Sequence, residues 1–81
     1  MKHKFQRKFI DQLESFPLEI RNKFQKQLIF LLQDIRHPSL HAKKYNENDD
    51  IWQARVDRNV RFYFKIDDDV YIIFRITKHP D

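Results

Sequence analysis

The feature that most constrains this chain is its last third, where three runs of β-branched and aromatic residues follow one another. The runs cover residues 51–56, 60–66 and 70–77, and short groups of Asp, Asn and Arg separate them. Such runs are typical of strands joined by hairpin turns. We therefore predict three consecutive antiparallel strands.

Each run alternates between two sets of side chains, and a period of two places these sets on opposite faces of a sheet. One set is mainly apolar: Trp52, Ala54, Val56, then Val60, Phe62, Phe64, Ile66, then Val70, Ile72, Phe74, Ile76. The opposite set is richer in polar and cationic residues: Ile51, Gln53, Arg55, then Arg61, Tyr63, Lys65, then Tyr71, Ile73, Arg75, Thr77. His79 continues the parity of the second set.

If the apolar sets share one face, Arg55, Arg61 and Arg75 share the other. The shortest loops, residues 57–59 and 67–69, would set Arg55 opposite Arg61 and Arg61 opposite Arg75. A register shift of two residues would preserve the shared face but stagger this row. Like charges directly across a ladder are destabilising, so such a row favours an anionic ligand. The alternative is that the three side chains are solvated and splay apart.

The first half of the chain predicts two helices. Apolar residues recur at helical spacing in two stretches, one with Phe5, Phe9, Ile10, Leu13, Phe16 and the other with Ile20, Phe24, Leu28, Leu31, Leu32, Ile35. We expect helices over residues 4 to about 15 and 18 to about 36, separated at Pro17 and stopped by Pro38. Residues 39–50 predict a loop or an irregular strand.

These elements predict a single α+β domain over residues 1–81, with an antiparallel helix pair packed on the apolar side of a three-stranded antiparallel sheet. The cationic side of the sheet stays bare. Ile29 and Phe30 widen the apolar stripe of the second helix, and we favour burial in the core over a surface reserved for a partner because a small domain needs the area.

Composition excludes several classes of site. The sequence has no cysteine and no glycine, which excludes thiolate chemistry and glycine-rich phosphate loops. The histidines, His3, His37, His41 and His79, lack metal-ligand spacing, so we expect no metal and no small-molecule cofactor. No apolar run approaches the ~18 residues of a membrane span, which favours a cytoplasmic protein. The net charge of +4 is a weak signal for nucleic acid.

The bare face suggests one reaction. Cleavage of RNA without metal needs a base for the 2′-hydroxyl proton, cations for the charge that grows on the phosphate, and an acid for the departing 5′-oxygen. Arg55 and Arg61 suit the second role, and His79 suits the third. A base is not evident, and an exposed histidine without a catalytic role is the alternative for His79.

Two stretches, residues 51–66 and 74–79, resemble the RelE/ParE superfamily of toxins from toxin-antitoxin systems. Those sequences share an arginine on the second strand and another at the start of the third, which match Arg55 and Arg61. The spacing from Arg55 to Arg61 and on to His79 is similar to that of the YoeB-like branch. The last four residues, from Lys78 to Asp81, resemble the end of YafQ-like toxins.

The resemblance implies a metal-independent, ribosome-dependent mRNA endonuclease that a cognate antitoxin holds inactive. It implies that Arg55 and Arg61 hold the scissile phosphate and that His79 is the general acid. The residues that it implies for RNA binding are Lys43, Lys44, Arg75 and Lys78. It also implies a short fourth strand within residues 1–5, at an edge that an antitoxin or a second copy could pair with.

Some family positions differ. A gapless count from the glutamate base of YoeB-like toxins reaches Ala42, and Pro80 follows His79 where those toxins have a tyrosine. The base is therefore open, with Lys44 and Glu47 as candidates. Two alternatives to the nuclease also stay open: a ParE-like inhibitor of DNA gyrase that works without catalysis, and an inactive member that only binds its antitoxin.

Overall fold

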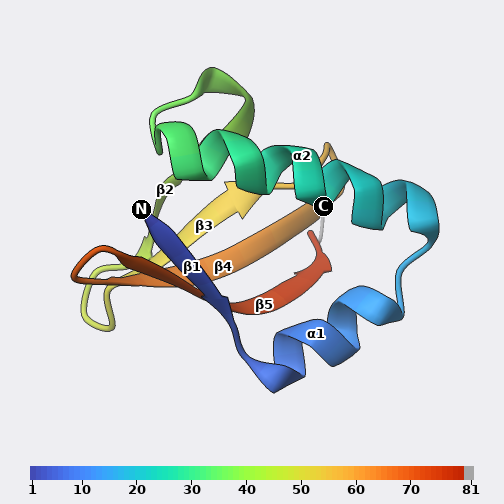
Figure 1. The fold of residues 1–81 in the computed structure, drawn as a ribbon, viewed down its shortest axis with the longest axis horizontal. Coiled ribbons are helices and arrows are strands. Elements are labelled where there is room, and N and C mark those ends of the chain that lie inside the picture. Colours follow the sequence, from blue (N-terminus) through green and yellow to red (C-terminus); the bar gives the residue numbers. More distant parts are fainter. Residues whose placement is uncertain (80–81) are drawn as a thin grey trace.

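The computed structural model describes residues 1–79, which form two helices packed on a five-stranded sheet (Figure 1). The elements in chain order are β1 (Lys2–Phe5), α1 (Arg7–Glu14), α2 (Leu18–Gln33), the 3₁₀ helix η1 (Pro38–Leu40), β2 (Lys43–Asn46), β3 (Ile51–Arg55), β4 (Val60–Asp67) and β5 (Val70–Lys78). The strand order is β1-β5-β4-β3-β2, and only the β1–β5 pairing is parallel. The predicted α+β fold is confirmed, with five strands in place of three or four.

The N-terminal residues form the short strand that the resemblance implied, and this strand extends to Phe5, past the point where the first helix was predicted to begin. Strand β1 pairs with β5 from Lys2 opposite Val70 to Phe5 opposite Ile73. The pairing satisfies backbone groups along one edge of β5, and α1 therefore begins only at Arg7. Helix α2 ends at Gln33, before the predicted end.

The core lies between the helices and the sheet and is built from aromatic rings. Phe9, Phe24, Phe62 and Phe64 are fully buried. The ring centroids of Phe9 and Phe24 lie 5.1 Å apart, and those of Phe24 and Phe62 lie 5.2 Å apart. These contacts join α1, α2 and β4, and the two helices run in opposite directions in Figure 1. Burial of each such side chain stabilises the fold by about 1.5–3 kcal/mol.

A β-bulge in β5 overturns part of the predicted alternation. Tyr63 pairs with Arg75 but Phe64 pairs with Ile73, so Phe74 is an extra residue on β5. A one-residue insertion moves the side chains before it to the other face. Tyr71 and Ile73 are therefore buried in the core, 4% and 0% exposed, where Val70 and Ile72 were predicted. Beyond the bulge Ile76 lies in the core as predicted.

The bulge and a tight turn also change the predicted row of arginines. Arg55 pairs with Arg61 as predicted. Arg61 pairs with Thr77, however, and Arg75 pairs with Tyr63, so the predicted Arg61–Arg75 pair is wrong. The β4–β5 turn contains two residues rather than three, because Asp67 pairs with Val70 and Asp68 takes a left-handed backbone with φ 53°.

The outer side of α2 carries a further correction. Ile29 is 55% exposed, so its predicted burial is wrong. Phe30 is partly buried against the core, and its ring stacks on that of His37 with centroids 3.8 Å apart. Neither helix within residues 1–79 has the length and apolar character that crossing a membrane requires.

Candidate functional site

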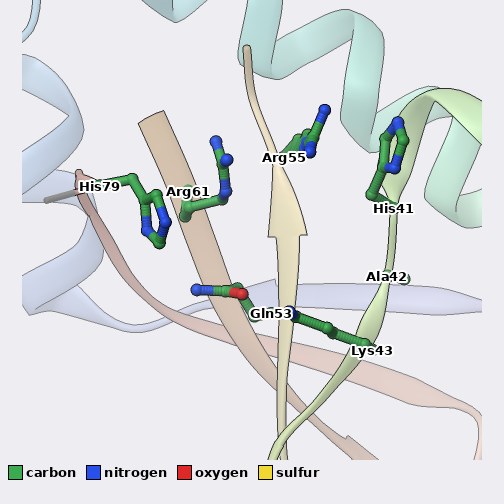
Figure 2. A pocket seen from close by; sticks show the side chains of 7 residues that line it. All are labelled: His41, Ala42, Lys43, Gln53, Arg55, Arg61 and His79. Carbon is green, nitrogen blue, oxygen red and sulfur yellow. The ribbon is translucent and has the colours of Figure 1, made fainter. Parts of the chain in front are cut away.

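A pocket of about 420 Å³ opens on the bare face of the sheet, beside the end of β3 and the start of β4 (Figure 2). Its lining comes from four separate parts of the chain and consists of His41, Ala42, Lys43, Gln53, Arg55, Arg61 and His79. Strand β2 and the segment before it form one wall, and the residue after β5 forms the other. The fold thus gathers most of the cationic and imidazole groups predicted for the site.

Arg61 is the least exposed of these cationic and imidazole groups and is held by the turn that precedes it. The side chain is 8% exposed. Its Nη1 donates to the carbonyl oxygens of Asp57 at 2.7 Å, Arg58 at 3.2 Å and Val60 at 3.2 Å. A guanidinium that binds several carbonyls of one turn has little freedom to reorient, so its position is fixed before any ligand arrives.

The two paired arginines have no carboxylate partner within residues 1–79. The carboxylate of Asp57 accepts hydrogen bonds from the backbone of Asn59 and Val60 and pairs with Lys23 Nζ at 3.5 Å. Burial, and secondly the charge of Arg55, lower the pKa of the Arg61 guanidinium. An arginine remains charged at neutral pH even so. A buried cation with which no carboxylate of residues 1–79 forms an ion pair favours an anionic ligand.

Two histidines flank the arginines in Figure 2. His79 follows β5, and its backbone N–H donates to the carbonyl of Asn59 at 2.6 Å, which extends the strand pairing to the pocket. His41 follows η1 and has a left-handed backbone with φ 47° and ψ 42°. Histidine tolerates this conformation better than most residues. The pocket therefore offers one imidazole on each side of the guanidinium pair.

A row of two polar and two cationic residues adjoins Arg55 and Arg61. Lys43, Gln53, Tyr63 and Arg75 lie in register across β2, β3, β4 and β5. Gln53 is 6% exposed, and its Nε2 donates to the Tyr63 hydroxyl at 3.0 Å. The Arg75 guanidinium lies 5.4 Å from the centre of the Tyr63 ring. The Gln53–Tyr63 hydrogen bond and the contact of Arg75 with the Tyr63 ring hold the middle of this row in place beside Arg55 and Arg61.

The structure brings together four of the predicted site residues, Arg55, Arg61, His79 and Lys43. Arg75 shares their face but lines a different hollow. Lys44 and Lys78, which the resemblance implied for RNA binding, lie outside this pocket. Lys44 pairs across the sheet with Trp52, on the opposite side, and its Nζ binds Asp50 at 2.6 Å. Lys78 pairs with Val60, whose side chain is in the core.

Sequence reasoning missed His41 and gave Gln53 no role. Gln53 has the same strand parity as Arg55, so the alternation already placed it on this face. His41 follows a segment without periodicity and gave no comparable signal. Ala42, to which the gapless count from the base of YoeB-like toxins leads, lines the pocket but carries no titratable group. Pro80, at the position of the family's tyrosine, lies outside the described residues. Within residues 1–79 no three histidine or carboxylate side chains are grouped so that they could hold a metal ion.

No protein-family model and no curated protein matches the sequence. Solved structures do match the fold. The YoeB/ParE toxin from Agrobacterium tumefaciens superposes with a TM-score of 0.81 at 12% identity, over 99% of this chain and 100% of that one. YafQ from E. coli gives a TM-score of 0.75 at 12% identity, over 96% and 92% of the two chains.

A third match is the RelB-RelE antitoxin-toxin complex from Methanococcus jannaschii, with a TM-score of 0.72 and 22% identity over 91% of this chain and 87% of that chain. This chain has the RelE/ParE toxin fold. The resemblance predicted from residues 51–66 and 74–79 is thereby confirmed for the fold. At these sequence identities the shared fold does not establish the reaction, which depends on the residues of the pocket.

Proposed function

We propose that this protein is the toxin of a toxin-antitoxin pair and that it cleaves mRNA on the ribosome without a metal ion. One observation carries the proposal: two guanidiniums without a carboxylate partner in residues 1–79 line one pocket together with two imidazoles. The fold supports it, because the similar structures are toxins and one of them is a complex with its antitoxin. A cognate antitoxin would hold the enzyme inactive.

Arg55 and Arg61 would bind the scissile phosphate. They are direct partners across the β3–β4 ladder, where their like charges repel each other until an anion binds between them. Charge-assisted bonds from arginine to phosphate are among the strongest hydrogen bonds in proteins. Because Arg61 is already held by three carbonyl groups, it would stabilise the additional negative charge of the transition state without reorganising.

The two histidines would divide the proton transfers. Neutral His41 takes the proton from the 2′-hydroxyl, the 2′-oxygen forms a bond to phosphorus, and the bond from phosphorus to the 5′-oxygen breaks. Protonated His79 gives its proton to that departing oxygen. The products are a 2′,3′-cyclic phosphate and a 5′-hydroxyl end. Each positioned acid or base contributes roughly 10²–10⁴-fold in rate.

The remainder of the bare face would hold the RNA backbone. Lys43 lines the pocket, and Arg75 lies at the other end of the row that contains Lys43, Gln53 and Tyr63. Lys65 and Lys4 lie in register with Ile72 on β4 and β1, further along the same face. Contacts from such residues to phosphates position a strand without reading its sequence.

The test is expression without antitoxin, followed by primer extension on cellular messages and cleavage of a defined mRNA on purified ribosomes. We expect cuts within translated codons, 2′,3′-cyclic phosphate ends, and no cut where a 2′-deoxy nucleotide replaces the one before the scissile phosphate. Toxin treated with chelator and verified as metal-free should cleave at an unchanged rate. Intact messages together with inhibited DNA supercoiling would instead support a gyrase inhibitor.

A further inference from the structure

A buried amide on α2 connects the backbone of Arg55, which lines the pocket, to the segment that leads into the β2 wall. Gln27 is 2% exposed although it lies on the otherwise apolar side of the helix. Its Nε2 donates to the carbonyl oxygen of Arg55 at 2.9 Å and to that of Ser39 at 3.1 Å. Its Oε1 accepts a hydrogen bond from the Ser39 hydroxyl at 3.0 Å. Both polar ends of the amide are therefore engaged.

These bonds join segments that the sheet leaves unconnected. Strand β2 pairs with β3 from Asn46 opposite Ile51 only as far as Lys43 opposite Gln53. Beyond the Lys43–Gln53 pair the β2–β3 ladder ends, so it does not link the segment that carries His41 to Arg55. Gln27 supplies this link from helix α2. It binds the backbone of Arg55 and the backbone of Ser39, which lies two residues before His41.

The segment that carries His41 is also fixed at its start. The backbone N–H of Ser39 donates to Nδ1 of His37 at 3.1 Å, and Leu40 is fully buried. His41 then takes its left-handed backbone and lines the pocket. A shift of Ser39 would thus be transmitted to His41 through only one intervening residue.

We propose that Gln27, with Ser39, is a positioning residue that sets the distance between the His41 imidazole and the phosphate held by Arg55 and Arg61. The inference rests on the proposed nuclease function. Core packing alone would be satisfied by an apolar residue at this position, whereas a buried amide must be hydrogen-bonded and so requires one arrangement of its partners. Misplacement of a catalytic group by about 1 Å lowers rates by roughly 100-fold.

The test replaces Gln27 by methionine, which has a similar shape and lacks both hydrogen-bonding ends. We expect Gln27→Met to remain folded, to lower the single-turnover rate of mRNA cleavage on ribosomes by at least about 10-fold, and to change ribosome binding by less than about twofold. Ser39→Ala should have a smaller effect in the same direction, and Ser39→Thr, which keeps the hydroxyl, should restore most of the rate. The matched control is Gln25→Met, an exposed position on the same helix, which should cleave at the wild-type rate.

A double-mutant cycle separates positioning from general loosening. If Gln27 acts through His41, Gln27→Met should lose most of its effect in a His41→Ala background. Full additivity of the two changes, or a wild-type rate in Gln27→Met, would overturn the inference. Should Gln27→Met fail to fold, Ser39→Ala takes its place in the cycle.

Failure of the nuclease proposal would be visible separately, as a wild-type protein that cleaves no message. The link can then be tested by NMR of the His41 ring. We expect its ¹H–¹³C resonances to shift in Gln27→Met and to stay in place in Gln25→Met. Unshifted resonances in both variants would overturn the positioning role whatever the protein's activity.

Discussion

The two faces of the sheet are both buried near the centre, but by different means. On the covered face, helices α1 and α2 bring Phe9 and Phe24 against the sheet, and apolar contacts account for the burial. On the bare face no helix intervenes, yet Arg61 and Tyr63 are only 8% and 6% exposed. Backbone carbonyls, neighbouring polar groups and other aromatic rings bury them.

This difference indicates what each face is for. Apolar burial provides most of the free energy of folding in a small domain. Burial of a guanidinium opposes folding unless its hydrogen bonds are satisfied, and the carbonyl groups of the β3–β4 turn accept those of Arg61 Nη1 without neutralising the charge. The bare face therefore holds a charge ready for a ligand, and the covered face provides the stability that this arrangement requires.

The largest effect should come from the covered face. Phe24→Ala removes a fully buried ring that contacts α1 and β4, and we expect a loss of about 3–5 kcal/mol in the free energy of unfolding. Urea denaturation followed by circular dichroism measures it. The matched change on the bare face is Tyr63→Phe, which removes only the hydroxyl that accepts from Gln53 and should lower stability by about 1 kcal/mol. Equal losses would contradict the division of roles between the faces.

The second-largest expected effect is on the rate of mRNA cleavage and comes from a residue of the bare face. Arg61→Ala should lower single-turnover mRNA cleavage by roughly 10²–10³-fold, because the group that holds the phosphate in the transition state is lost. Arg61→Lys should restore little, since an ammonium cannot span the turn carbonyls and a phosphate as a planar guanidinium does.

Arg75→Ala is the control for this change, because Arg75 lies on the same face and outside the pocket. It should reduce cleavage only a few-fold. A variant of Arg61 that cleaves normally, or an equal loss in both variants, would mean that the face acts as a diffuse cationic surface and that the pocket has no special role.

The sequence predicted the two faces where alternation was unambiguous. In β3 and β4, charged or polar residues such as Arg55, Arg61 and Tyr63 mark one parity clearly, and the structure agrees. The first half of β5 is apolar at both parities, so the sequence carried no sign of the extra residue Phe74. The position of Arg75 relative to Arg61 depended on that residue and on the two-residue β4–β5 turn, and it could not be predicted.

Three other features were beyond the local periodicity of the sequence. Strand β1 forms because residues 2–5 pair with residues 70–73 at the far end of the chain, and no periodicity within four residues reveals such a partner. The left-handed backbone of His41 and the Gln27 link are likewise products of the packed structure. The candidate site was thus predicted for Arg55, Arg61 and His79 and missed for the residue now proposed as the base.

A smaller effect should come from the part of the bare face that lies away from the pocket. Lys4 and Lys65 share a row there with Ile72, and neither has an ion pair within residues 1–79. If each contacts one RNA phosphate, Lys4→Gln and Lys65→Gln should each reduce the slope of log K against log salt by about 0.7 for single-stranded RNA.

The measurement is binding of a non-cleavable 2′-deoxy-substituted RNA at several salt concentrations. Lys26→Gln, an exposed lysine on α2, is the control and should leave the slope unchanged. If Lys26→Gln lowers the slope as much as the sheet variants do, the RNA does not follow the bare face.

The smallest expected effect is on stability and concerns the ion pair between Lys44 and Asp50, at the margin of the covered face. The hydrogen bond from Lys44, 2.6 Å long, lowers the pKa of the exposed Asp50 carboxyl. Its contribution to stability is therefore present above the ordinary pKa of about 3.9 and is lost as the pH falls through the lower value in the folded state. Asp50→Asn keeps a residue that tolerates the left-handed backbone at this position, with φ 58°.

Thermal unfolding of the wild type and of Asp50→Asn between pH 6 and pH 2 measures the contribution of the Lys44–Asp50 pair to stability. We expect a small deficit in Tm for Asp50→Asn at pH 6, which disappears in strong acid and shrinks in high salt because the pair is exposed. Asp68→Asn is the control, since Asp68 is also left-handed but has no ion pair within residues 1–79, and the salt dependence of its Tm should match the wild type. A deficit in Asp50→Asn that persists undiminished at pH 2 would show that Asp50 stabilises the β2–β3 turn through its backbone and that the bond to Lys44 contributes nothing.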